Sequence, residues 1–210
     1  MTNVKPRRRV FVGLSGGVDS SVSAVLLKEQ NYDVTGVYIM GWQPDFLTCT
    51  AEDDKRDAMR VCAKLGIPFR CLDLSLEYKK LVADVFIEEY RAGRTPNPDI
   101  LCNREIKFGR FLSWALLNGA DFVATGHYAS VGKSDSGNYE LLRSKDAEKD
   151  QTYFLWMLKQ PQLAALLFPV GRFFEIRSTR EGERLRAAYF NKKRQPRGLF
   201  RRQFCHEEFS

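Results

Sequence analysis

Two short stretches of the chain contain residues whose types and spacing suit chemistry. The first is Ser-Gly-Gly-Val-Asp-Ser-Ser at residues 15–21, between an apolar run at 9–14 and apolar residues at helical spacing over 22–27. Adjacent glycines let backbone N–H groups approach an anion, and a helix N-terminus adds free N–H groups and a positive dipole end. The stretch therefore predicts a phosphate site. It lacks the lysine of a Walker loop, and an ordinary glycine-rich turn is the alternative.

The second stretch is 93–103, a loop with two prolines and a helix start. Asp99 and Cys102 are three residues apart, so one helical turn puts both side chains on one side. A thiolate can attack carbon, and a nearby carboxylate can move protons. The helix N-terminus, or a cation such as Arg104 or Lys107, would lower the pKa of Cys102. The alternative is a small buried cysteine beside an Asp99 helix cap.

Strands alternate with helices along the chain. This order predicts an α/β fold with a parallel sheet and flanking helices, in which ligands bind at the carboxyl ends of the strands. Met40 and Gly126–His127 fall at such ends. The expected strands are 9–14, 34–40, 69–74 and 121–126, and the expected helices are 22–30, 50–65, 77–90 and 108–118.

Composition limits the class of protein. The chain has 210 residues, 44% of them hydrophobic, with no run long enough to span a membrane and no secretory signal. Five cysteines without paired spacing fit reduced thiols, so we expect a cytoplasmic protein without a membrane partner. The net charge of +7 comes mostly from residues 172–210, which hold eleven Lys and Arg against five Asp and Glu. The charge therefore does not mark the folded part as a nucleic-acid binder, and DNA is not an expected partner.

The first stretch resembles the PP-loop of the ATP pyrophosphatases, and both stretches together resemble the tRNA-specific 2-thiouridylase family over residues 9–171. The resemblance implies a PP-loop ATPase (HUP-like) domain. It also implies ATP-dependent replacement of the C2 oxygen of the wobble uridine of tRNA by sulfur, through an adenylated tRNA. The strings that carry the resemblance are Gly13–Ser20, Cys49–Asp54, Gly93–Phe108, Ala124–Ala129 and Lys149–Leu155.

The resemblance also implies roles for individual residues. Cys102 is the implied nucleophile and Asp99 the implied acid/base, and the implied partners are tRNA and a persulfide donor of the sulfur-relay or cysteine desulfurase type. Mg²⁺ would lie near Asp19. The residues implied to bind ATP are Gly13, Leu14, Ser15, Gly16, Gly17, Val18, Asp19, Ser20, Met40 and Gly126. Those implied to face the target base are Asn97, Pro98 and Asp99, and those implied to contact tRNA are Lys149, Asp150 and Gln151.

The resemblance stops after residue 171. The family carries a second cysteine in a string such as Asp-Ser-His-Gly-Val-Cys-Phe, whereas Cys205 has other neighbours. Codons for 194–201 can be chosen so that a one-nucleotide shift gives that string. We therefore expect an incomplete catalytic domain at 1–171 and a basic, non-native or disordered tail at 172–210. A genuine RNA-binding tail is the alternative.

Two other readings of the function stay open. One is another PP-loop enzyme that adenylates its substrate in order to form an amide, although forming an amide needs no nucleophilic thiol. The other is a non-catalytic remnant that binds ATP or tRNA.

Several further residues are weaker candidates. His127 could contact a ligand or be a hydrogen-bonded structural histidine. Trp42, Trp114 and Trp156 could stack on bases, but the helical patterns around Trp114 and Trp156 favour the core. Cys62 and Cys71 have the pattern of core thiols.

Overall fold

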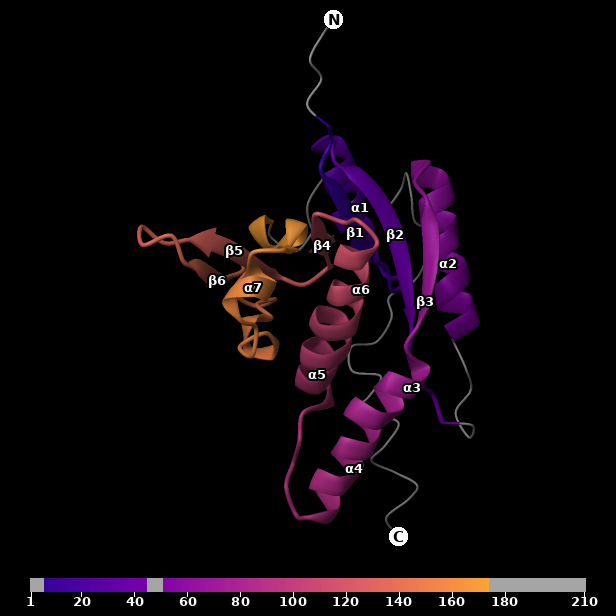
Figure 1. Cartoon of the computed structure of the whole chain (residues 1–210), viewed down its shortest axis with the longest axis vertical. Coiled ribbons are helices and arrows are strands. Elements are labelled where there is room, and N and C mark those ends of the chain that lie inside the picture. The colour runs from indigo at the N-terminus through magenta and orange to yellow at the C-terminus, as the bar shows by residue number, and fades with distance from the viewer. Residues whose placement is uncertain (1–5, 45–50, 174–210) are drawn as a thin grey trace, which may run out of the picture.

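A five-stranded parallel sheet forms the centre of the molecule (Figure 1). The structure, a computed structural model of the chain, describes residues 6–44 and 51–173. The strand order β3-β2-β1-β4-β7 confirms the predicted α/β class. The predicted tail, apart from residues 172 and 173, lies outside the described residues, as do Cys49 and Cys205. The strands are β1 (Arg9–Gly13), β2 (Asp33–Met40), β3 (Phe69–Asp73), β4 (Phe122–Ala124) and β7 (Leu166–Leu167).

Two long helical runs differ from the sequence prediction because each contains a π-helical segment. The expected helix at 77–90 begins earlier and has three parts, and the helix expected from residue 108 begins at Pro98. None of the described helices combines the length and apolar character needed to cross a bilayer. The first run is α3 (Ser75–Tyr78), a π segment (Lys79–Ala83) and α4 (Asp84–Arg91). The second is α5 (Pro98–Leu101), a π segment (Cys102–Phe111) and α6 (Leu112–Leu117).

Both faces of the sheet are covered, as expected for parallel strands. Side chains alternate along β1, so Val10 and Val12 point to one face and Phe11 to the other, and all three are buried. The first face packs against α1 (Val18–Glu29) and α2 (Ala51–Leu65). The second packs against the helix that carries Cys102.

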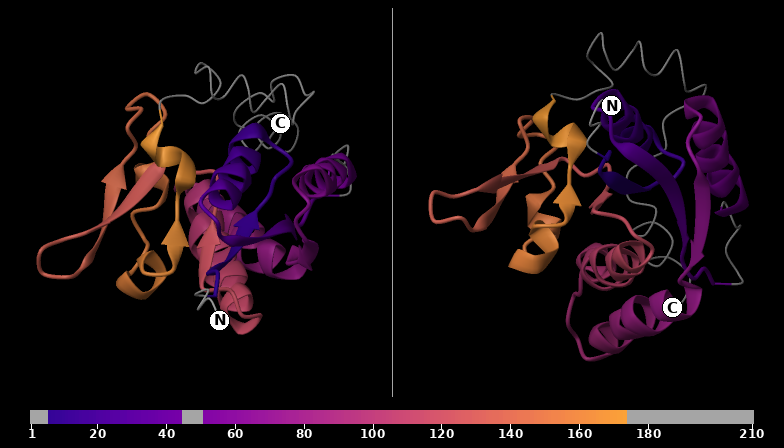
Figure 2. Two further views of the ribbon diagram at one scale, coloured as in Figure 1. Left: turned by 90° about the horizontal axis from the view of Figure 1, so that it is seen from above. Right: turned by 45° about the horizontal axis from the view of Figure 1, so that its top comes forward.

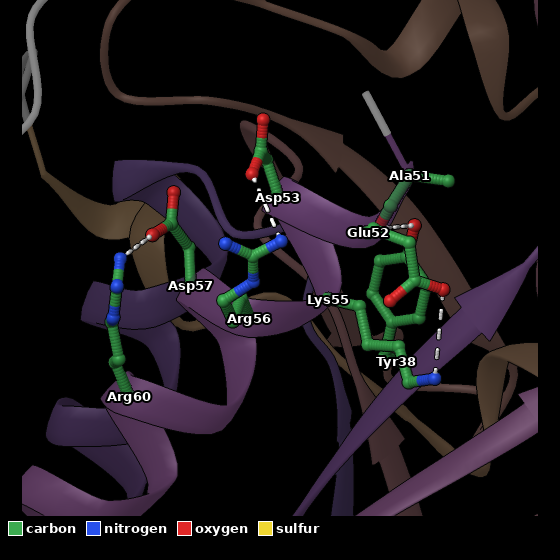
Figure 3. Close-up of polar contacts among 8 residues, drawn as sticks. All are labelled: Tyr38, Ala51, Glu52, Asp53, Lys55, Arg56, Asp57 and Arg60. Carbon is green, nitrogen blue, oxygen red and sulfur yellow. Dashed lines mark hydrogen bonds and ion pairs between the residues drawn. The ribbon is translucent and has the colours of Figure 1, made fainter. Parts of the chain in front are cut away.

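The start of α2 is attached to the sheet by one hydrogen bond. The Tyr38 hydroxyl, on β2, donates to the Ala51 carbonyl oxygen over 3.1 Å (Figure 3). Surface ion pairs at i,i+3 spacing, some of them partly buried, also run along α2, and such pairs contribute little to stability. They are Glu52–Lys55 at 3.9 Å, Asp53–Arg56 at 3.4 Å and Asp57–Arg60 at 3.0 Å.

A small antiparallel hairpin extends to one side of the main sheet (Figure 2). It consists of β5 (Ala129–Lys133) and β6 (Tyr139–Arg143), which the sequence analysis did not predict. The start of β5 packs closely on Gly171. A Cβ added to Gly171 would lie 1.6 Å from the Ala129 carbonyl oxygen. Two 3₁₀ turns, Thr152–Phe154 and Pro169–Arg172, and α7 (Gln160–Leu163) complete the described chain.

Phe111 should be a major contributor to stability. Its side chain is fully buried between β1 and the helix that carries Cys102. A Cβ added to Gly13, at the end of β1, would lie 3.5 Å from the Phe111 ring. We expect Phe111→Ala to lower the free energy of unfolding by about 3–5 kcal/mol, measured by urea denaturation. Leu117→Ala, at a side chain 89% exposed, is the control and should change it by less than about 0.5 kcal/mol. Equal effects of the two variants would contradict the packing described.

Candidate active site

The segment between β1 and α1 makes a turn that requires glycine. Gly16 has a φ of +72°, and a Cβ there would lie 2.7 Å from the Asp54 carbonyl oxygen. Gly17 is the N-cap of α1 and provides no side-chain cap. The first N–H groups of α1 therefore lack a side-chain acceptor at the cap, as in helix N-termini that bind phosphate.

Serine side chains hold this turn. The Ser15 N–H donates to Ser20 Oγ at 3.3 Å, and the Ser20 hydroxyl donates to the Gly17 carbonyl oxygen at 3.2 Å. Ser21 donates to the same carbonyl at 2.6 Å and is fully buried, whereas Ser15 is exposed. Ser21 is thus part of the scaffold, and Ser15 offers an accessible hydroxyl.

The end of β4 lies against this loop. A Cβ on Gly126 would lie 2.5 Å from the Ser20 backbone nitrogen, so only glycine fits. The Ser23 hydroxyl donates to the Thr125 carbonyl oxygen at 3.2 Å and ties the same two segments together. Met40, half-buried at the end of β2, lies at the same carboxyl edge of the sheet. The structure thus gathers the predicted ATP residues on three neighbouring strand ends.

Asp19 is the carboxylate of the glycine-rich loop at 13–20, which we call the phosphate-type loop because it resembles phosphate-binding loops. It is half-buried in the first turn of α1, and the Tyr128 hydroxyl donates to its Oδ1 at 3.4 Å. Among the described residues no group of three or more His, Cys, Asp and Glu side chains could hold a metal ion by itself. Mg²⁺ is commonly bound by one or two carboxylates together with substrate phosphates, so a single aspartate fits a Mg²⁺–ATP site better than a protein-only metal site.

Asn97 starts the helix that carries the thiol. Its Oδ1 accepts the N–H groups of Asp99 at 3.0 Å and Ile100 at 3.4 Å, and Pro98 occupies the first helical position. The alternative in which Asp99 caps this helix is therefore wrong. Asp99 is left exposed, and Cys102 follows one turn later as a half-buried free thiol.

The electrostatics at Cys102 differ from the sequence expectation. Burial raises the pKa of the Cys102 thiol, the Lys107 charge lowers it, and the Asp99 charge raises it again, with a net upward shift. The expected lowering of this pKa is wrong because burial outweighs the neighbouring cation. Cys102 is thus protonated at neutral pH in the free protein.

Tyr78 belongs to this group of residues, although the sequence analysis did not single it out. Burial and the charges of Cys102 and Asp99 raise the pKa of its phenol. Its ring also packs on Gly41, where a Cβ would lie 3.2 Å from Tyr78 Cδ2. The one feature of the sequence that could have indicated Tyr78 is its position shortly after the strand predicted at 69–74, where ligands bind in parallel sheets.

His127 has the geometry of the structural histidine considered above. Its Nδ1 lies 2.7 Å from Thr125 Oγ1, and its ring packs against Phe108 and Phe168 at centroid distances of 5.7 and 6.1 Å. Burial, and then the Lys107 charge, lower the pKa of the imidazole, so it is neutral at pH 7. Lys107 lies on the helix that carries Cys102, and His127 directly follows Gly126 at the end of β4. The effect of the Lys107 charge on His127 is therefore an electrostatic link between that helix and the end of β4.

Residues 149–151 are mostly engaged within the protein. Asp150 accepts the Ser144 N–H at 2.9 Å and the Thr152 hydroxyl at 2.6 Å. Gln151 Oε1 accepts the Tyr128 N–H at 2.9 Å, and Lys149 is half-buried. The Asp150 and Gln151 side chains therefore shape this segment. Their contact with tRNA stays a prediction.

Two expectations about core residues are wrong. Trp156 is 65% exposed because it lies in a turn after a 3₁₀ segment rather than on an amphipathic helix. Cys71 is exposed because β3 is the edge strand of the sheet. Trp114 packs against Phe11, with the ring centroids 5.7 Å apart, and Cys62 is buried, both as predicted.

Comparison with known proteins identifies the family. Residues 8–198 match the sequence model of the tRNA methyl transferase HUP domain, a match that extends past residue 171. The chain belongs to this family. It is 50% identical over 187 residues to the tRNA-specific 2-thiouridylase MnmA of Streptococcus pyogenes, covering 88% of this chain and 50% of that protein. It is 54% identical over 165 residues to the protein of the same name from Halalkalibacterium halodurans, covering 78% and 44%.

The chain spans about half the length of these curated relatives. Among solved structures, the U34-tRNA thiolase NcsA from Methanococcus maripaludis is similar, with a TM-score of 0.56 and 20% identity over 93% of this chain and 61% of that chain. A predicted subunit of tRNA methyltransferase from Methanocaldococcus jannaschii gives a TM-score of 0.50 at 18% identity, over 86% and 74%. At these identities the two structures support the fold alone.

The contact at Gly126 can be tested by substitution. Gly126→Ala should force β4 and the start of α1 apart, and we expect a lower melting temperature and weaker ATP binding by calorimetry. Leu117→Ala, at an 89% exposed side chain outside the site, is the control and should leave both the melting temperature and the ATP affinity unchanged. Wild-type melting and ATP affinity in Gly126→Ala would show that the close approach is not required.

The thiols should differ in reactivity. At pH 7 we expect iodoacetamide to modify exposed Cys71 fastest and Cys62 slowest, because burial raises the pKa of Cys62 to about 11. Cys102 should lie between them, and its rate should rise as the pH is raised through its elevated pKa. Peptide mass spectrometry after limited labelling measures all three. Faster labelling of Cys102 than of Cys71 at pH 7 would contradict this order.

Proposed function

We propose that this chain carries the ATP-binding and thiol-bearing part of an enzyme that replaces the C2 oxygen of the wobble uridine of tRNA with sulfur. The main support is that Cys102 and Asp99 lie one helical turn apart and act on Tyr78, which follows β3 and packs on Gly41 just after β2. These are carboxyl ends of strands in the sheet whose β1 leads into the loop at 13–20. The names of the curated relatives give the same reaction class. We place this activity in the cytoplasm, with tRNA and a persulfide donor as the partners.

In the first step the uridine C2 oxygen attacks the α-phosphorus of ATP, and pyrophosphate leaves. The loop at 13–20 binds the ATP phosphates through its N–H groups, with Met40 and Gly126 beside the nucleotide. Asp19 would hold Mg²⁺, which would neutralise phosphate charge. Asn97 and Pro98 set the base against Asp99, and residues 149–151 contact the tRNA.

In the second step sulfur replaces the activated oxygen, and AMP leaves. The donor is a persulfide supplied by a sulfur relay or a cysteine desulfurase. The terminal sulfur of the persulfide attacks C2, and AMP departs with the oxygen. The Cys102 thiolate then attacks the inner sulfur of the persulfide, which breaks the S–S bond, leaves 2-thiouridine and forms a disulfide between Cys102 and the donor cysteine. An external thiol reduces this disulfide afterwards, and Asp99 moves the protons. An amidating synthetase would use the same ATP loop but has no use for this thiol and carboxylate pair. We propose residues 1–171 as the catalytic domain and residues 172–210 as a basic segment that follows it.

Single-turnover assays with tRNA and ATP separate the roles of these residues. Cys102→Ser should still release pyrophosphate when tRNA is added but should form no 2-thiouridine. Asp99→Asn should slow the reaction by about 10²–10⁴-fold, the usual contribution of a general acid or base. Asp135→Asn, at an exposed position in the hairpin turn, is the matched control and should react at the wild-type rate.

The same assay tests the alternatives. A wild-type chain that binds ATP but never releases pyrophosphate with tRNA would be the non-catalytic remnant. Pyrophosphate release that needs an amine acceptor in place of tRNA would indicate the amidating type.

A further inference from the structure

The helix that carries Cys102 changes from α- to π-type hydrogen bonding at that residue. In a π-helix each carbonyl bonds to the N–H five residues later, so residues five apart lie about one turn apart. Lys107 is five residues after Cys102, on the same turn of the π segment. Gly109 permits this close turn, because a Cβ there would lie 2.8 Å from the Arg104 carbonyl oxygen, five residues earlier.

Lys107 is held in a fixed place. Its Nζ donates to Asn103 Oδ1 at 3.0 Å, and the Asn103 side chain is buried and donates through Nδ2 to the Phe154 carbonyl oxygen at 3.3 Å. Lys107 is half-buried and forms no ion pair with any residue in the described ranges. An ammonium taken out of water without a counterion is costly, so the site favours an anion beside it.

The other charged and titratable groups around Cys102 do not supply a cation. Asp99 from α5 and Tyr78 from α3 are acids, and His127 after β4 is neutral. Arg104 is already paired, since its Nε donates to Glu105 at 2.5 Å and its Nη1 contacts Met157 Sδ at 3.6 Å. Lys107 is therefore the one positive charge among these groups that acts on the Cys102 sulfur.

We propose that Lys107 is a positioning residue that holds the Cys102 sulfur in its anionic, attacking form once the thiol proton has been lost to solvent. The inference rests on the proposed function for the role of Cys102 as the nucleophile. The π turn places Lys107 near Cys102, and the hydrogen bond to Asn103 restricts the movement of the ammonium group. The Cys102 thiolate, once formed, is the counterion that Lys107 otherwise lacks. Burial keeps the resting thiol protonated, and Lys107 limits the cost of ionising it.

The test is the pH dependence of iodoacetamide labelling at Cys102, followed by peptide mass spectrometry. Lys107→Gln, which keeps a donor for Asn103 but no charge, should raise the apparent pKa of Cys102 by about one unit and slow labelling at pH 8 by about tenfold. Lys107→Arg should retain the wild-type profile. Arg104→Gln is the matched control and should not shift it. An unshifted profile in folded Lys107→Gln would overturn the proposal.

A second measurement needs no variant of Lys107. In the wild-type chain the Cε resonance of Lys107 should show an inflection at the pH where Cys102 ionises, and Cys102→Ser should abolish it. Absence of that inflection would also overturn the proposal. A loss of ATP affinity in Lys107→Gln with an unchanged Cys102 profile would identify phosphate as the counterion instead. These readouts do not depend on tRNA turnover, so a failure of the proposed function is seen separately, as absent pyrophosphate release in the wild-type chain.

Discussion

The contact between Gly126 and the backbone of Asp19 and Ser20 determines where the rest of the site can lie. It sets the end of β4 directly on the first turn of α1, with no room for a side chain between them. Just after Gly126, the His127 ring packs against Phe108 of the helix that carries Cys102, and the Tyr128 hydroxyl donates to the Asp19 carboxylate. A single backbone approach thus joins the phosphate-type loop to the helix that carries Cys102.

Opposing electrostatic effects meet at Cys102. Burial disfavours the thiolate, Asp99 adds to that effect, and Lys107 opposes both. Each pKa unit of such a shift corresponds to about 1.4 kcal/mol between thiol and thiolate. The net result is a resting thiol that is protected from adventitious alkylation and oxidation, since reactivity follows the thiolate fraction. The carboxylate that suits proton transfer therefore adds to the effect of burial, which is the main reason that the thiol stays protonated.

A chain of hydrogen bonds connects the segment at 149–151 with the loop at 13–20. Gln151 fixes the backbone of Tyr128, and the Tyr128 hydroxyl donates to Asp19. Asp150 holds the same segment through Ser144 and Thr152. The Asp150 and Gln151 side chains, for which the resemblance implies a tRNA contact, are thus part of the scaffold, so substitutions there should alter the local structure.

The local sequence was enough to predict the parallel sheet, the glycine loop and the Asp99–Cys102 pair, because each depends on periodicity or on neighbours within one turn. Only the tertiary structure decided the pKa of Cys102, the role of Asn97 as the cap and the place of Tyr78. Burial is a property of the assembled core, and the sequence around Cys102 shows nearby charges without showing how much water is removed. The exposure of Cys71 likewise depends on β3 being an edge strand, and strand order is decided by how distant segments pack.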